Sequence, residues 1–146
     1  SRRSVRSYDT KDLTEDDRKL IDSWINDICN EQKPFPAKMK VRLLGAVSGT
    51  DTEKLGTYGV IRGARCFLCV TVEDLPGAME AVGYHCEKLV LSATAHGLGT
   101  CWLAGTFRRD RFSEELSLGE KEIFPIVCPI GYPADRMNII NNIFRK

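Results

Sequence analysis

The segment over residues 64–72, Ala-Arg-Cys-Phe-Leu-Cys-Val-Thr-Val, constrains the fold of this chain more than any other. After its arginine the segment is almost entirely apolar, and it is rich in the β-branched and aromatic residues that favour strands. A strand without a polar face is typical of the centre of a sheet, where both faces are covered. The sequence therefore predicts a sheet with residues 64–72 at its centre.

Two further elements are predicted before this strand. Thr14 begins a helix with the capping pattern Thr-Glu-Asp-Asp, and apolar residues follow at helical spacing. The Lys-Pro-Phe-Pro run at 33–36 ends this helix, because proline cannot continue it. The alternation of Val41, Leu43 and Val47 then predicts a strand.

A long helix is predicted after the central strand. It begins at Pro76-Gly77 and runs to about His96, where Gly97 is suited to a left-handed stop. The residues expected to face inward from it are Met79, Val82, Cys86, Leu89, Val90 and Ala93.

The rest of the chain completes the pattern of an α+β domain. A short strand at 100–103, a helix at 108–116 and a strand at 123–132 follow the long helix. Pro125 and Pro129 within the last strand predict an edge position or a bulge. This order favours a mixed sheet packed by helices. The composition shows no domain boundary, so residues 1–146 are expected to form a single domain.

Charge and hydropathy exclude two classes of partner. The net charge is +1, and the basic cluster at the start of the chain has no interleaved aromatic residues, so we expect no nucleic-acid binding. No apolar run approaches the roughly 20 residues that span a bilayer, so we expect no membrane association.

The six cysteines are expected to be reduced and buried, as in a cytoplasmic protein, because they are scattered through apolar runs. Cys66 and Cys69 form a C-x-x-C pair, but residues three apart on a strand point to opposite faces. We therefore expect no metal site.

Three segments carry residues suited to binding. Arg2-Arg3-Ser4-Val5-Arg6 supplies three guanidinium groups and a hydroxyl, which suit phosphate oxygens, although a solvated basic terminus is the alternative. Residues 97–105 contain three glycines that let the backbone approach a ligand closely, although tight helix–strand packing is the alternative. Residues 130–135 close a strand with a turn.

Together, in this order and spacing, these segments resemble the nitroreductase family. The resemblance implies an α+β fold whose mixed sheet is mainly antiparallel and packed by helices. The opening Arg-Arg-Ser-Val-Arg-Ser-Tyr resembles the motif that grips the phosphate and ribityl chain of flavin mononucleotide (FMN). Gly-Leu-Gly-Thr-Cys-Trp-Leu-Ala-Gly-Thr-Phe resembles the flavin-facing loop, and Ile-Gly-Tyr-Pro-Ala-Asp resembles the last core strand and its turn. Residues 55–64 are similar to those of a branch in which one chain holds two pseudo-repeated lobes.

The resemblance implies a flavin site and names its residues. The phosphate and ribityl end would be held by Arg2, Arg3, Ser4 and Arg6, and the isoalloxazine would face the backbone of Leu103, Ala104 and Gly105. No catalytic side chain is implied, because the flavin carries the chemistry.

The implied activity is a ping-pong transfer of electrons from NAD(P)H through FMN to a small-molecule acceptor such as a nitroaromatic or a quinone. Because family sites lie between two lobes, the resemblance implies a homodimer or a missing second lobe. Two alternatives remain open: a flavin carrier or sensor without efficient turnover, and a non-enzymatic interaction domain that has lost flavin.

The chain also departs from the family pattern. Lys33 to Ala37 replace a Pro-Ser-x-x-Asn-x-Gln-Pro-Trp stretch that contacts flavin in many members. The helix that normally precedes the arginine motif and the segment that normally follows Lys146 are missing, so the resemblance implies a domain that is incomplete at both ends.

Overall fold

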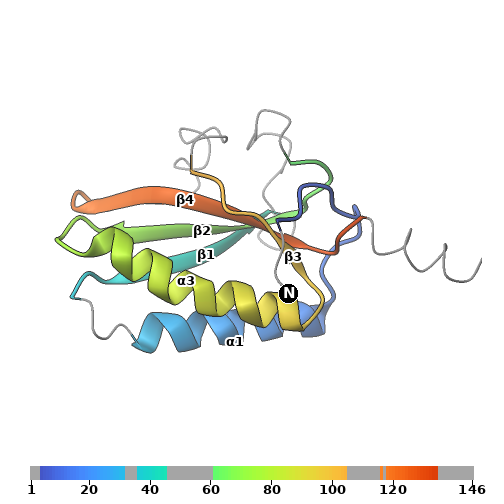
Figure 1. Cartoon of the computed structure of the whole chain (residues 1–146), viewed down its shortest axis with the longest axis horizontal. Coiled ribbons are helices and arrows are strands. Elements are labelled where there is room, and N and C mark those ends of the chain that lie inside the picture. The colour runs from blue at the N-terminus through green and yellow to red at the C-terminus, as the bar shows by residue number, and fades with distance from the viewer. Residues whose placement is uncertain (1–3, 32–35, 46–60, 105–115, 117, 135–146) are drawn as a thin grey trace, which may run out of the picture.

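The computed structural model of the chain describes residues 4–31, 36–45, 61–104, 116 and 118–134. In chain order, the elements in these residues are α1 (Glu15–Glu31), β1 (Met39–Gly45), β2 (Cys66–Glu73), α3 (Ala78–Ala95), β3 (Gly99–Thr100) and β4 (Glu122–Gly131). Figure 1 shows α1 and α3 side by side against one face of the sheet. The helix predicted over 108–116 lies outside the described residues except for Leu116, and Val47 lies outside them too.

The sheet has the strand order β1-β2-β4-β3, and each neighbouring pair is antiparallel. β2 lies between β1 and β4 and is buried at every position except Glu73, so its predicted central position is confirmed. Isolated bridges from Ser4 to Thr100 and from Ser7 to Arg62 are parallel. The prediction of an α+β fold with a mixed, mainly antiparallel sheet is therefore confirmed.

A bulge accommodates the proline in the first half of β4. Val70 of β2 pairs with Ile126, whereas Val72 pairs with Ile123, so two residues of β4 oppose one residue of β2. Pro125 is one of these two residues. The structure therefore shows the bulge that the proline predicted at this position.

The sheet has a separate apolar core on each face. Cys66 belongs to the core beneath the helices, together with Ile21 of α1 and Leu89 of α3. Cys69 belongs to the core on the opposite face. The prediction that the C-x-x-C pair points to opposite faces is confirmed, and the described residues contain no cluster suited to holding a metal ion.

The predicted stop of the long helix is also confirmed. Gly97 has a φ of 82°, its N–H donates to the Thr94 carbonyl at 3.0 Å, and the Leu98 N–H donates to the Ala93 carbonyl at 2.9 Å. These two bonds make a Schellman motif, which turns the chain sharply from α3 into β3.

Met79 does not face inward as predicted. The buried positions of α3 are Ala78, Ala81, Val82, His85, Cys86, Leu89, Val90 and Ala93, and this stripe passes Met79 on one side. The Met79 residue is 51% exposed. At about 100° per residue, a single-position error in placing the stripe is enough to turn a side chain from the core to the surface.

Neither helix in the described residues is long and apolar enough to cross a bilayer.

Candidate functional site

The N-terminal segment over residues 4–9 lies beside β3, although the two are far apart in sequence. The Val5 N–H donates to the Thr100 carbonyl at 2.9 Å, and Ser4 forms a parallel bridge with Thr100. Close packing accompanies this pairing, because a Cβ atom at Gly99 would come within 2.8 Å of the Val5 Cβ. The tertiary structure thus brings the arginine-rich segment and the glycine-rich segment together.

The same N-terminal segment, which we call the arm (residues 4–9), is held along its other half by two more segments. The Tyr8 N–H donates to the Arg62 carbonyl at 2.8 Å, and the Arg62 N–H donates to the Arg6 carbonyl at 2.8 Å. Beyond them, the Asp9 N–H donates to the Tyr132 carbonyl at 2.8 Å. The described parts of the segments that resemble family motifs therefore all meet at the arm.

Tyr8 anchors the arm in the core. Its residue is 5% exposed and belongs to the apolar core on the face opposite the helices. Its hydroxyl donates to the Pro129 carbonyl at 3.5 Å, and burial raises the pKa of Tyr8 far above its ordinary value. A neutral, packed phenol of this kind fixes the position of its neighbours.

The predicted binding residues of the arm differ in exposure. Ser4 is half-buried beside Thr100, and Arg6 is exposed although its carbonyl is bound by Arg62. A fixed backbone with an exposed guanidinium group is suited to binding an anion from solvent. Arg2 and Arg3 lie outside the described residues.

The loop after β3 begins as an extension of the sheet. The Leu103 N–H donates to the Val127 carbonyl at 2.9 Å, and the Leu103 carbonyl accepts from the Val127 N–H at 3.0 Å. The Leu103 side chain is buried, whereas Ala104 is exposed. The backbone bends at Ala104, and Gly105 lies outside the described residues.

A buried hydroxyl marks the junction of arm and loop. Thr100 is 1% exposed, and its Oγ1 atom has no hydrogen-bond partner among the described residues. Buried polar atoms in native proteins are nearly always paired. Thr100 lies directly beside Ser4, so a polar group at this junction fits a site that takes a polar ligand.

Trp102 lines a groove on the surface beside the loop. The groove has a volume of about 240 Å³, and the residues that line it are Met79, Val82, Gly83, Cys86, Glu87, Trp102 and Ile126. Apart from Glu87, its lining is apolar or glycine. Its lining comes from α3, from Trp102 after β3 and from Ile126 of β4.

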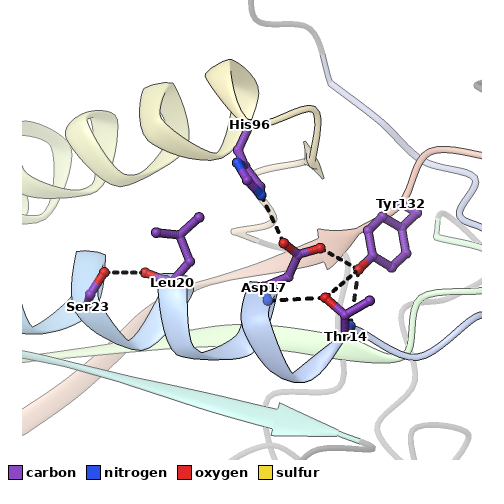
Figure 2. Close-up of polar contacts among 6 residues, drawn as sticks. All are labelled: Thr14, Asp17, Leu20, Ser23, His96 and Tyr132. Atoms are coloured by element: carbon purple, nitrogen blue, oxygen red, sulfur yellow. Dashed lines mark hydrogen bonds and ion pairs between the residues drawn. The ribbon is translucent and has the colours of Figure 1, made fainter.

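A cluster of hydrogen-bonded side chains, which was not predicted from the sequence, joins the elements around the arm. We call this cluster of Asp17, Tyr132, His96 and Thr14 the polar node. Figure 2 shows Asp17 between Tyr132, which follows β4, and His96, which ends α3. The Tyr132 hydroxyl donates to Asp17 Oδ2 at 2.5 Å, and His96 Nε2 lies 2.9 Å from Asp17 Oδ1. The hydrogen bond from Tyr132, together with that from His96, holds the pKa of Asp17 below its ordinary value. Asp17 is therefore a carboxylate at neutral pH.

The sequence carried only part of the signal for this node. Thr14 caps α1 as predicted, because its Oγ1 accepts the Asp17 N–H at 3.1 Å. In a full capping box the acid at the third position bonds the N-cap N–H, but here the Thr14 N–H donates to the Tyr132 hydroxyl at 3.1 Å. The Asp17 carboxylate is thus left to make tertiary contacts.

The family is decided by the pattern of the whole chain. Residues 1–145 match the family model described as "Putative TM nitroreductase". The chain belongs to this nitroreductase family. No curated protein sequence matches it.

Solved structures of nitroreductases have the same fold. An FMN-dependent nitroreductase from Clostridium difficile is 18% identical, with a TM-score of 0.68 over 92% of this chain and 84% of that chain. A nitroreductase with bound FMN from Desulfitobacterium hafniense is 18% identical, with a TM-score of 0.64 over 91% and 85% of the two chains. A nitroreductase family protein from Clostridium novyi is 19% identical, with a TM-score of 0.66 over 94% and 83%. These similarities confirm the nitroreductase-like fold.

Proposed function

We propose that this nitroreductase-family chain binds FMN and acts as an oxidoreductase. It would transfer electrons from NAD(P)H to a nitroaromatic, quinone or similar acceptor by a ping-pong mechanism. The observation that carries the proposal is the pairing of the arm with β3, where the Val5 N–H donates to the Thr100 carbonyl. Ser4 pairs with Thr100, which precedes the loop at Ala104 in the chain, and the exposed Arg6 follows Ser4 in the arm. The names of two solved structures with this fold, FMN-dependent nitroreductase and nitroreductase with bound FMN, support the choice of cofactor.

In this proposal the chain divides its residues between the two ends of the cofactor. Arg6 and Ser4, with Arg2 and Arg3, would bind the phosphate and ribityl end through charge-assisted hydrogen bonds. Ala104 and Gly105 would face the isoalloxazine. We assign Leu103 to anchoring the loop, because its N–H donates to Val127.

FMN, when bound, would supply the redox chemistry, so the protein needs no side-chain acid or base for it. The described residues agree with this division of labour. Tyr8 is buried and neutral, and His96 is held by Asp17. The chain would orient the cofactor and shield part of it from water.

We also propose that a second copy of the chain, or a second lobe, covers the groove beside Trp102. Met79 and Leu91 are each 51% exposed on α3, and the groove that contains Met79 is largely apolar. Exposed apolar surface of this kind is typical of an interface. A cytoplasmic location belongs to the same proposal, since none of the six cysteines forms a disulfide.

An absorption spectrum tests the proposed function. The purified protein is mixed with FMN, desalted and scanned between roughly 300 and 550 nm, and NADH or NADPH is then added without oxygen. Retained flavin bands that fade on addition of the nicotinamide are the expected result. Bands that persist unreduced would favour a flavin carrier, and a colourless protein would contradict FMN binding.

A further inference from the structure

We propose that Asp17 is a positioning residue for the FMN site, because its carboxylate holds the two segments between which the arm lies. The inference rests on the proposed function, since it concerns how firmly the arm is placed for FMN. Asp17 itself is on α1 and belongs to none of the motifs that resemble the family pattern. It would act through the arm and not by contact with the cofactor.

The first held segment is the turn from α3 into β3. Asp17 Oδ1 lies 2.9 Å from Nε2 of His96, the residue that caps the C-terminal end of α3. The Schellman motif at Gly97 follows immediately, and the chain then reaches Thr100, whose carbonyl accepts the Val5 N–H. Fixing His96 therefore fixes the start of the strand to which the arm is bonded.

The second held segment is the turn after β4. The Tyr132 side chain donates to Asp17 Oδ2 at 2.5 Å, while the Tyr132 carbonyl accepts the Asp9 N–H at 2.8 Å. One residue thus contacts Asp17 through its side chain and the arm through its backbone. Figure 2 shows that the two oxygens of Asp17 point to different partners, so one carboxylate serves both sides of the arm.

A carboxylate is the group that this node requires. The Tyr132 hydroxyl and the His96 ring both offer donors, and an ionised carboxylate accepts at both oxygens. Its charge is also favoured in the first turn of a helix, where Asp17 lies. An asparagine at position 17 would keep one acceptor oxygen but carry no charge, so both contacts would lose the strength that the ionised carboxylate gives them.

The test compares FMN dissociation constants, measured by quenching of flavin fluorescence, with thermal unfolding midpoints. The variants are Asp17→Asn, Tyr132→Phe and their combination. The matched control is Glu31→Gln, which weakens the 2.7 Å ion pair between Glu31 and Lys88 that also joins α1 to α3. This control leaves both segments beside the arm untouched.

We expect Asp17→Asn and Tyr132→Phe each to raise the dissociation constant of FMN about tenfold. The double variant should cost less than the sum of the two single variants, because both weaken the bond between Asp17 and Tyr132. Glu31→Gln should change the constant by less than about twofold, since an exposed ion pair contributes little. If Asp17→Asn does not fold, the milder Tyr132→Phe variant decides the question.

Two results would overturn the inference and leave the proposed function standing. In the first, the native chain retains FMN and both single variants bind it equally well. In the second, Glu31→Gln and Asp17→Asn lower the thermal unfolding midpoint equally and also weaken FMN binding equally. General packing of the helices would then explain the effect. A native chain that retains no FMN would instead overturn the proposed function, and the inference with it.

Discussion

Gly99 and Val5 pack so closely that position 99 has no room for a side chain: a Cβ atom there would come 2.8 Å from the Val5 Cβ and 2.9 Å from both Val5 methyl groups. Val5 is buried and its N–H is bonded to the next residue of β3, so it has little freedom to move away. The absence of a side chain at Gly99 is therefore what allows the arm to lie against β3.

Gly99→Ala is expected to lower the free energy of unfolding by about 1–3 kcal/mol, because an overpacked core must shift to relieve the contact. Urea unfolding measures the change, and FMN retention should fall with it. Gly83→Ala is the matched control, since a Cβ at position 83 meets nothing within 4 Å. Inside α3, that control should stabilise the protein by about 1 kcal/mol. Equal effects from the two variants would contradict the role given to Gly99.

Arg6→Ala is expected to weaken FMN binding about 10- to 100-fold, the range typical of losing one charge-assisted hydrogen bond to an anion. Fluorescence titration measures the constant. The unfolding midpoint should change little, because the Arg6 side chain is exposed. Arg18→Ala, which removes an exposed arginine from α1, serves as the control and should bind FMN normally. Unchanged affinity in Arg6→Ala would remove Arg6 from the proposed site.

Cys69 and Cys86 are expected to make the protein less stable in strong alkali. Burial raises the pKa of each thiol from 9.0 to about 12. Below pH 9 both thiols are protonated whether the chain is folded or not, so stability does not depend on them. Between about pH 9 and pH 12 the unfolded chain loses these protons first, so the free energy of unfolding falls as the pH rises.

The slope expected from each thiol in that window is about 1.4 kcal/mol per pH unit. Urea unfolding at a series of pH values measures this slope, and Cys69→Ala should remove the part of it that the Cys69 thiol contributes. Native thiols should also react slowly with a disulfide reagent at about pH 8, because the thiolate is the reactive form. Fast reaction of Cys69 in the folded protein would contradict its burial.

Met79→Glu is expected to shift the protein toward the monomer. A charge placed in the groove beside Trp102 would have to be desolvated on association, which raises the dimer dissociation constant at least about tenfold. Sedimentation velocity measures the shift. Leu118→Glu is the control, because Leu118 is also an exposed apolar residue but lies beside a different pocket, with Lys40 and Arg42. Equal sedimentation of native protein and Met79→Glu would contradict an interface between two copies of the chain at this groove.

Signals contained within a few neighbouring residues determined much of this fold from the sequence alone. The Thr14 cap, the Gly97 stop and the opposite faces of Cys66 and Cys69 all follow from local geometry, and the structure confirms each of them. The central position of β2 followed from its lack of a polar face. The resemblance to nitroreductases also came from the sequence, because it depends on the order and spacing of motifs.

Only the tertiary structure decided which distant groups meet. The sequence left Pro125 between an edge and a bulge, and the register of β4 against β2 showed the bulge. The sequence also predicted that Met79 faces inward, which is wrong. A small error in the angle of a helical stripe is enough to move a side chain from the core to the surface. The sequence showed Asp17 only as part of a cap. The partners Tyr132 and His96 come from remote elements, and no local pattern encodes such a contact, since it arises only when the elements pack together.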